Sequence, residues 1–300
     1  MKRWPSRPVL GTSFYKAHGL GNDYLVFREG AAWRATPEAI RAICRRHRGV
    51  GSDGVVVLLG TEPAGPVRLR MFNPDGGEFE RSGNGLRILA AFLCREGLVG
   101  GDSFPVEVGG QRVVLTVHGV LDGTYDVSVD MGRCRVGPDA VGLSARALDE
   151  QGRLPGPAGE ALHVVPVSVG NPHLVTLVDD ATDETLDRLG PFLVAHPGLA
   201  DGANVQLATV LDRSRVRALI WERGVGRTSA SGTSACAVAV AAVAEGLVDA
   251  GDVTVKMDGG TLMVSVDREY DTVIRGRVEE VLVGDVTAGW VSRRADHDRA

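Results

Sequence analysis

The sequence predicts an α+β protein made of two pseudo-symmetric domains. A stretch from Asn73 to Val99 matches a later one from Glu222 to Val248 without a gap, 149 residues further along the chain. Within this match Ser82 aligns with Ser231, and each serine is followed by an apolar run with helical spacing. A self-match of this length indicates that a whole structural unit is duplicated. Short runs rich in β-branched residues lie on both sides of each helical run, as is typical of strands.

Composition narrows the class of protein. With 300 residues, of which 44% are hydrophobic and 24% charged, the chain is long enough for about two ordinary domains. The net charge of −5 argues against a nucleic-acid partner, and no apolar run approaches the roughly 20 residues of a membrane span. The N-terminal residues lack the apolar core of a signal peptide, and the four cysteines are scattered. We therefore expect a reduced, cytoplasmic protein with no membrane partner.

Motifs in the first half define its expected elements. Thr36-Pro37 is a typical helix start, and that helix is expected to end near Gly49. The run after Ser82 is apolar nearly all round, which indicates a buried central helix over residues 84–95. A Gly-rich turn interrupts residues 12–27 and separates two strands. Further strands are expected at residues 55–59, 67–72, 104–108, 112–118 and 125–130.

The second half is expected to repeat this plan, with strands at 164–169, 174–178, from 204 and at 215–221, and helices at 186–192 and 232–245. Residues 132–159 are rich in Gly, Pro and Ala, which predicts a crossing between domains and a surface excursion. Residues 1–11 and 292–300 are expected to be loose tails. The predicted domains are 13–130, to which 278–290 return, and 131–277.

The repeat places the same chemistry in each half. Ser82 and Ser231 each precede the N-terminus of a buried helix, where unpaired N–H groups and a partial positive charge favour an anion. A carboxylate held there would be stabilised further as its α-proton leaves. A serine on each side of the α-carbon would then suit inversion of a stereocentre. The alternative interpretation is that both serines are ordinary helix N-caps, and that Asn22 and its repeat partner Asn171 are turn residues.

Several motifs together resemble the diaminopimelate epimerase family. They are HGLGNDYLVF, RHRGVGSDGVVVL, MFNPDGGEFERSGNGLR, VGNPH, WERGVGRT and ASGTSACAVAVAA, in the family's order between about Phe14 and Val286. The resemblance implies a cofactor-independent, two-base isomerase that converts LL- to meso-diaminopimelate for lysine and peptidoglycan precursors. It also implies that each domain is a curved, mostly antiparallel sheet wrapped around one central helix, with the active site in the cleft between the domains. A small amino acid is the implied partner, no metal or other cofactor is implied, and homodimer formation is left open.

The resemblance also implies roles for individual residues. Ser82 and Ser231 stand at the positions of the two bases, His173 lies near the bases, and Glu222 orients one of them. The implied substrate-binding residues are Asn22, Asn73, Gly83, Asn84, Asn171, Asn204, Glu222, Arg223, Gly232 and Thr233. Asn73 aligns with Glu222 in the repeat, so the two halves differ here, as an asymmetric diamino diacid requires.

Both base positions depart from the family, which has cysteine at each of them. A thiol has a pKa near 8.5, and a helix N-terminus lowers it further, whereas a serine hydroxyl is a far weaker acid that needs a neighbouring base. Three interpretations follow: an inactivated epimerase, a divergent paralogue that performs one-sided proton abstraction, isomerisation or elimination on another small acid, or a ligand-binding form without bases. Phenazine-pathway isomerases share the fold and lack the cysteine pair. Gly54, Arg227 and Ser234 also differ from the family's usual residues, which favours natural divergence.

Other catalytic classes fit the sequence poorly. A pyridoxal-phosphate racemase needs a Schiff-base lysine, and neither Lys16 nor Lys256 lies in a motif. Metal catalysis would require a ligand motif such as HExxH or CxxC, and the sequence has neither. A binding protein with an amino-acid cleft is the main non-enzyme alternative, and it predicts ligand affinity without solvent exchange at the α-carbon.

Overall fold

The computed structural model describes residues 7–60, 67–79, 81–100 and 103–295. It divides into two compact units, one formed by residues up to Val129 together with residues from Arg277 onward, and the other by Asp130–Gly276. The first unit is therefore discontinuous in sequence, while the second is continuous. Within the described residues, no helix combines the length and the apolar character that a membrane span requires.

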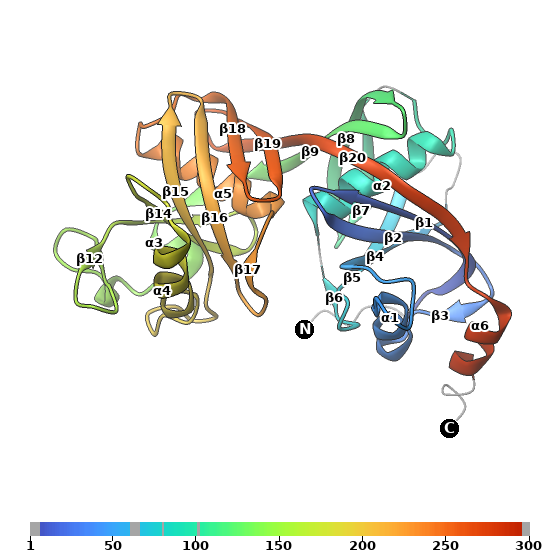
Figure 1. Cartoon of the computed structure of the whole chain (residues 1–300). Coiled ribbons are helices and arrows are strands. Elements are labelled where there is room, and N and C mark those ends of the chain that lie inside the picture. Colours follow the sequence, from blue (N-terminus) through green and yellow to red (C-terminus); the bar gives the residue numbers. More distant parts are fainter. Residues whose placement is uncertain (1–6, 61–66, 80, 101–102, 296–300) are drawn as a thin grey trace. The chain divides into compact units, whose positions relative to one another are not determined.

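The first unit is a mixed sheet with one helix inside its curve and two further helices outside it (Figure 1). Neighbouring strands pair as β1–β2 antiparallel, β2–β4 parallel, β4–β5 antiparallel, β5–β7 parallel, then β7–β8 and β8–β9 antiparallel. Its elements are β1 (Val9–Gly19), β2 (Asn22–Glu29), β3 (Trp33–Arg34), α1 (Pro37–Cys44), β4 (Gly54–Leu59), β5 (Val67–Phe72), β6 (Glu78–Phe79), α2 (Gly83–Arg95), β7 (Phe104–Val108), β8 (Gln111–Leu121) and β9 (Thr124–Arg133).

The second unit repeats this order of pairings. Its strands pair as β13–β14 antiparallel, β14–β15 parallel, β15–β16 antiparallel, β16–β18 parallel, then β18–β19 and β19–β20 antiparallel. Its elements are β10 (Arg135–Val136), α3 (Pro138–Val141), the 3-10 turn Ala145–Ala147, β11 (Leu154–Pro155), β12 (Ala161–Leu162), β13 (Val164–Ser168), β14 (Pro172–Leu177), α4 (Asp183–Val194), β15 (Asn204–Asp212), β16 (Arg215–Glu222), β17 (Gly226–Thr228), α5 (Gly232–Ala244), β18 (Gly251–Met257), β19 (Gly260–Val266) and β20 (Asp271–Asp285). The last strand, β20, extends into the first unit, where its later residues pair with β1.

Each sheet surrounds one central helix, as predicted. Helix α2 is buried from Gly83 to Leu93 and contacts β1, β2, β4 and β8. Helix α5 is buried from Ser234 to Ala242 and contacts β13, β14, β15, β16, β18 and β19. Because a helix enclosed by strands on several sides has no face in water, both helices must be apolar nearly all round. This explains why their sequences lack the polar stripe of a surface helix.

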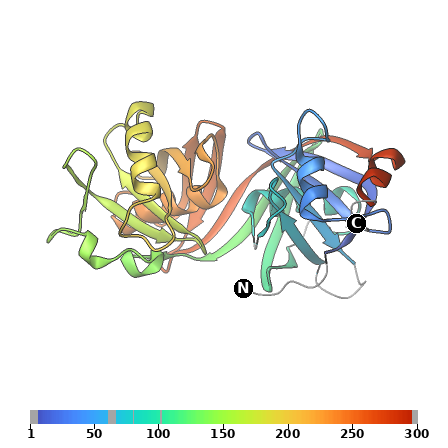
Figure 2. The ribbon, with the colours of Figure 1, turned by 90° about the horizontal axis from the view of Figure 1, so that it is seen from below.

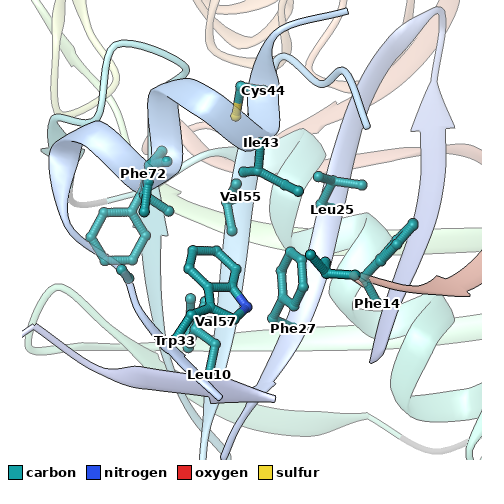
Figure 3. Close-up of a cluster of buried hydrophobic side chains, with 14 of the residues drawn as sticks. Leu10, Phe14, Leu25, Phe27, Trp33, Ile43, Cys44, Val55, Val57 and Phe72 are labelled. Atoms are coloured by element: carbon teal, nitrogen blue, oxygen red, sulfur yellow. The ribbon is translucent and has the colours of Figure 1, made fainter. Parts of the chain in front are cut away.

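An aromatic cluster fixes the C-terminal end of the chain in the first unit. Phe27, Trp33 and Val57 point toward one another in the core (Figure 3). The Trp33 ring meets Phe27 edge-on at 5.2 Å between centroids, and it meets Trp290 at 5.3 Å. Trp290 belongs to α6 (Ala288–Ala295), which lies beside the first strands in both views (Figures 1 and 2). The C-terminal segment is thus anchored by burial of a large aromatic side chain.

Some expected boundaries were wrong. Val9 to Gly11 begin β1, and Ser292 to Ala295 are helical, so these residues are not loose tails; residues 1–6 and 296–300 lie outside the described residues. Helix α1 ends at Cys44, well before Gly49. Helix α4 is longer than the expected 186–192 because Thr182 caps it through the N–H of Thr185. Residues 132–159 are not only a crossing, since β10 pairs with β13 and α3 packs on the same strand.

Candidate active site

In the first unit, the site is built around the N-terminus of α2. Ser82 immediately precedes this helix; its backbone is extended, and its Oγ accepts a hydrogen bond from the N–H of Gly85 at 3.1 Å. Ser82 is therefore the N-cap that the alternative interpretation anticipated, and it stands at the site of unpaired helix N–H groups at the same time. Gly83 and Asn84 follow it as the first helical residues and are buried.

Asn22 and Asn84 are joined in the first unit. The Asn84 Nδ2 donates to the Asn22 Oδ1 at 2.7 Å and to the Asn22 carbonyl at 2.8 Å. The Asn84 Oδ1 accepts from Arg87 Nη2 at 3.0 Å. Arg87 is only 2% exposed, and its burial lowers its pKa to about 10, so it remains a cation at neutral pH. This buried charge, just over one turn inside α2, adds to the positive potential of the helix end.

Beside Asn22, two carboxylates and two cations form a compact cluster. Lys16 Nζ lies 2.8 Å from Asp23, and Arg46 bridges Asp23 at 2.8 Å and Asp53 at 2.6 Å. Burial alone would raise the pKa of Asp23, but hydrogen bonds from Arg46 and Lys16 outweigh it and lower this pKa to about 2. The Asn22 Nδ2 donates to Asp53 at 3.4 Å. The cluster therefore holds the Asn22 amide from the side opposite Asn84.

In the second unit, the equivalent site lies at the start of α5. Ser231 is the N-cap, but its Oγ lies 3.5 Å from the N–H of Ser234 and 3.5 Å from the Thr233 hydroxyl, so this cap is longer than that of Ser82. Glu222 ends β16 beside it. Burial raises the pKa of the Glu222 carboxyl, and a hydrogen bond from Ser231 lowers it in part. A carboxylate paired with a serine hydroxyl is the arrangement that general-base activation requires.

His173 is fully buried on β14, which is separated from β16 by β15, and it belongs to an amide network. Its Nδ1 accepts from Gln206 Nε2 at 3.0 Å, which leaves Nε2–H to donate to the Asn171 Oδ1 at 3.0 Å. Burial lowers the pKa of His173 to about 3, and the Arg223 charge adds to this change. The imidazole is therefore neutral, and the network sets the orientation of Asn171.

Asn204 and Arg223 meet at the far end of β16. The Asn204 Oδ1 accepts from the Arg223 backbone N–H at 3.0 Å, and the Arg223 guanidinium donates to the Asp201 carbonyl. A cavity of about 440 Å³ is lined by Arg223 together with His196, Leu199 and Asp201. Arg227, one of the departures from the family pattern, does not line it; it pairs instead with Asp183, and more distantly with Asp187 and Asp258.

The predicted site residues therefore gather in groups within each unit. In the first unit Asn22 and Asn84 meet at the α2 N-terminus, while Asn73 is exposed in a turn, where its carbonyl accepts from the N–H of Gly76. In the second unit the groups are Asn171 with His173, Glu222 with Ser231, and Asn204 with Arg223, and Gly232 and Thr233 open α5.

Sequence reasoning did not single out three side chains of these networks: Tyr24, Arg87 and Gln206. Tyr24 OH donates to the Ser82 Oγ at 3.4 Å, and Gln206 Nε2 also donates to Ser234 Oγ at 3.0 Å. Two signals were present in the sequence. Tyr24 is the repeat partner of His173, and Arg87 is a cation inside the otherwise apolar run from Leu86 to Leu93.

Comparison with known proteins gives consistent matches. The model of a family described as diaminopimelate epimerase matches residues 14–136 and 165–281. Diaminopimelate epimerase 2 of Nostoc sp. is 35% identical over 283 residues, covering 91% of this chain and 95% of the relative. The diaminopimelate epimerase of Halorhodospira halophila is 40% identical over 281 residues, covering 89% and 94%. The crystal structure of a phenazine biosynthesis protein from Bacillus anthracis matches with a TM-score of 0.64 at 16% identity, and the match covers 92% of this chain and 99% of that one. This similarity shows the fold alone.

Proposed function

Because the chain belongs to the diaminopimelate epimerase family, we propose that it interconverts LL- and meso-diaminopimelate by two-base proton transfer, without a cofactor. Its relatives are named as epimerases of this diamino diacid, and by family the chain is an amino-acid epimerase. The observation that carries the proposal is the pair of serines at equivalent helix N-termini, each with a proton-bearing side chain beside it. In this proposal both serines act on the same α-carbon.

Binding of the α-carboxylate follows from the helix ends. The first N–H groups of α2, at Gly83 and Asn84, and of α5, at Gly232 and Thr233, lack intrahelical partners and present a partial positive charge. When the α-proton leaves, negative charge builds on the carboxylate, and these fixed donors stabilise it more than they stabilise the ground state. Arg87 adds an unscreened cation from within the helix.

Proton transfer in the second unit uses Ser231 and Glu222. A serine hydroxyl alone is too weak an acid to supply an alkoxide at neutral pH. In the proposed step the α-proton moves to the Ser231 Oγ while the Ser231 proton moves to the Glu222 carboxylate. The raised pKa of Glu222 makes it a stronger proton acceptor than an exposed carboxylate, and it donates to Ser231 in the reverse direction.

Recognition of the distal end of the substrate is assigned to Arg223. Its backbone is fixed by Asn204, and Arg223 is one of the residues that line the cavity of about 440 Å³. A guanidinium suits a second carboxylate because it offers several donors in one plane. His173 acts through Asn171, whose amide it holds.

The test is α-proton exchange in D₂O. LL- and meso-diaminopimelate are incubated separately with the protein, and deuterium at the α-carbon and the appearance of the other isomer are followed by NMR. The wild-type protein is expected to exchange and to invert. A Ser82→Cys, Ser231→Cys variant tests the scaffold, because thiols are stronger acids in the same positions, and Ser82→Ala, Ser231→Ala is the negative control. Absence of exchange in both the wild-type protein and the cysteine variant would refute the proposed substrate.

A second candidate is one-sided proton abstraction from another small acid. It is favoured by the inequality of the halves, because Glu222 provides a carboxylate base in the second unit while Asn73 occupies its repeat position in the first. The same experiment, run also with other small amino and carboxylic acids in place of diaminopimelate, separates the two functions. One-sided chemistry gives exchange with retention of configuration in the wild-type protein, and a ligand-binding form gives affinity without exchange.

A further inference from the structure

The phenol of Tyr24 lies against the serine of the first unit. Tyr24 is the third residue of β2, is 6% exposed, and directs its OH to the Ser82 Oγ at 3.4 Å. The same oxygen accepts the N–H of Gly85 at 3.1 Å. The Tyr24 hydroxyl and the Gly85 N–H therefore both donate to the Ser82 Oγ. The hydroxyl proton of Ser82 itself then points away from these two groups. The contact is long for a hydroxyl pair, as active-site hydrogen bonds often are before substrate binds.

Two glycines shape the slot that holds this ring. Gly54 is the residue opposite Tyr24 in the parallel β2–β4 pairing. A Cβ on Gly54 would lie 2.3 Å from Tyr24 Cε1, and one on Gly85 would lie 3.3 Å from the same atom. Any side chain at position 54 would therefore force the Tyr24 ring away. The small residue on the strand and the small residue on the helix together allow the phenol to reach Ser82.

The repeat places a second proton-bearing ring at the matching position. Tyr24 lies 149 residues before His173, as Asn22 lies 149 residues before Asn171. Both rings are buried beside the start of their central helix, and both belong to the hydrogen-bond network of their unit. A buried hydroxyl that meets a candidate base, in a slot that requires glycine, is more than a packing residue.

We propose that Tyr24 is the proton-relay partner of Ser82, a positioning residue for the reaction of the proposed function, on which this inference rests. In the step that protonates the substrate, the Ser82 O–H bond breaks as a Cα–H bond forms. The Tyr24 O–H bond breaks at the same time, a new Ser82 O–H bond forms, and a phenolate remains. The reverse step returns the proton along the same path, and no oxidant or reductant takes part.

The relay compensates for the low acidity of the serine hydroxyl, which makes serine alone a poor proton-transfer group. A phenol has a pKa near 10, whereas an isolated serine hydroxyl forms no useful alkoxide near neutral pH. The charge that would otherwise rest on Ser82 is carried by Tyr24, which delocalises it over the ring. Ser82 then needs only to pass a proton between two neighbours. The first unit thereby matches the second, where Glu222 takes the same role toward Ser231.

Tyr24→Phe is the direct test, because it removes one oxygen and keeps the ring. Interconversion of LL- and meso-diaminopimelate is expected to fall by about 10²- to 10⁴-fold, the usual contribution of general acid–base groups. Exchange from the isomer that the second unit deprotonates is expected to persist, with retention of configuration. Tyr15→Phe is the matched control, because Tyr15 is buried in the same unit and its hydroxyl has no hydrogen-bond partner within the described chain. Tyr15→Phe should keep the rate of interconversion and the rate of deuterium exchange within about twofold of the wild-type values.

A spectroscopic readout tests the contact without substrate. The chain contains four tyrosines, so protein labelled with ¹³C at the tyrosine Cζ gives four resonances, and Tyr24→Phe identifies the one from Tyr24. Ser82→Ala is expected to move the Tyr24 resonance and to leave that of Tyr15 in place. Gly54→Ala should also move the Tyr24 resonance and lower the rate of interconversion, because the new methyl group displaces the Tyr24 ring. Gly60→Ala, where a Cβ meets only Glu29 Oε2 at 3.9 Å, is its control.

The outcomes distinguish failure of the relay from failure of the proposed function. A wild-type protein that exchanges no deuterium refutes the proposed function, and the relay falls with it. A Tyr24→Phe protein that interconverts the isomers within about twofold of an active wild type refutes the relay alone. A Tyr24 resonance that does not respond to Ser82→Ala also refutes the relay alone, whatever the activity of the wild type.

Discussion

At the scale of single residues, His173 shows how burial decides chemistry. Histidine is the residue most often associated with proton transfer near neutral pH. Here the ring is enclosed, accepts at Nδ1 from Gln206 and donates at Nε2 to Asn171. With its pKa lowered to about 3 by burial, it cannot serve as a cationic acid at physiological pH. What the ring does in the structure is hold the Asn171 amide through its Nε2–H.

This assignment predicts a specific pH dependence of stability. An unfolded histidine has a pKa near 6.5, so between pH 6.5 and about 3 the unfolded chain binds the His173 proton and the folded chain does not. The contribution of His173 is therefore complete above pH 6.5 and is lost as the pH falls. Urea unfolding should show that the wild-type protein loses about 2 kcal/mol more than His173→Gln does between pH 7 and pH 5.

Comparing the two proteins removes the effects of other titrating groups, which they share. Asp23 does not interfere, because its pKa is lowered from 3.8 to about 2 and its contribution changes only below pH 4. Equal pH dependence in the wild type and in His173→Gln would contradict a buried, neutral imidazole. So would an imidazole NMR signal, absent from the variant, that titrates with a midpoint near 6.5.

At the scale of secondary-structure elements, α2 and α5 begin at equivalent positions but are capped unequally. The Ser82 Oγ lies 3.1 Å from the N–H that it caps, whereas the Ser231 Oγ lies 3.5 Å from its own. Hydrogen bonds weaken toward the longer distance. Ser231 also lowers the pKa of the Glu222 carboxyl, so its hydroxyl interacts with a second group besides the helix N–H. Ser231 is thus a weaker N-cap for its helix than Ser82 is.

We therefore predict that Ser82→Ala lowers the free energy of unfolding by about 1 kcal/mol and that Ser231→Ala lowers it by less than about 0.5 kcal/mol. Chemical denaturation of both variants measures the difference. Thr182→Ala at the start of α4 is a reference, because Thr182 caps the N–H of Thr185 at 3.2 Å, outside both sites. A larger loss for Ser231 than for Ser82 would contradict the inferred inequality of the caps.

Elements differ in how far the sequence predicted them. The two central helices were predicted to within one residue, because a continuous apolar run and a glycine after its end are local signals. The end of α1 was not, because distant groups decide it. Gly51 N–H donates to the Ile43 carbonyl and Lys16 Nζ binds the Gly51 carbonyl at 2.7 Å, while Arg46 is drawn to Asp23. Contacts across this sequence separation leave no periodic pattern.

At the scale of the whole molecule, the internal match predicted that the second half repeats the plan of the first, and both units show the same order of strand pairings. The path of the last strand could not be read from it. The early residues of β20 pair with β19, and its later residues pair with β1, as in Lys16 opposite Leu282. Likewise, alignment of the halves found Ser82 and Ser231, but the bond from Tyr24 to Ser82 depends on how β2 lies beside α2. That contact needs three-dimensional packing.

The division of the chain predicts which part folds alone. In the second unit the pairings from β13 to β19 are made among its own strands, and Leu174, Leu186 and Leu207 belong to a core formed entirely within it. The first unit, in contrast, takes a partner for β1 from residues 279–285 and takes Trp290 into its core. A fragment of residues 130–276 is therefore expected to fold, and a fragment of residues 1–129 is not.

Thermal unfolding followed by circular dichroism, together with the dispersion of amide NMR signals, measures both fragments. The 130–276 fragment should unfold cooperatively, while the 1–129 fragment should lack a transition, because β1 has lost one neighbour and Trp33 faces water where Trp290 had packed. Joining residues 277–300 to the shorter fragment through a flexible linker should restore a transition, since it returns both the strand and the tryptophan. Cooperative folding of 1–129 without that addition would show that the C-terminal segment is not needed for the core of the first unit.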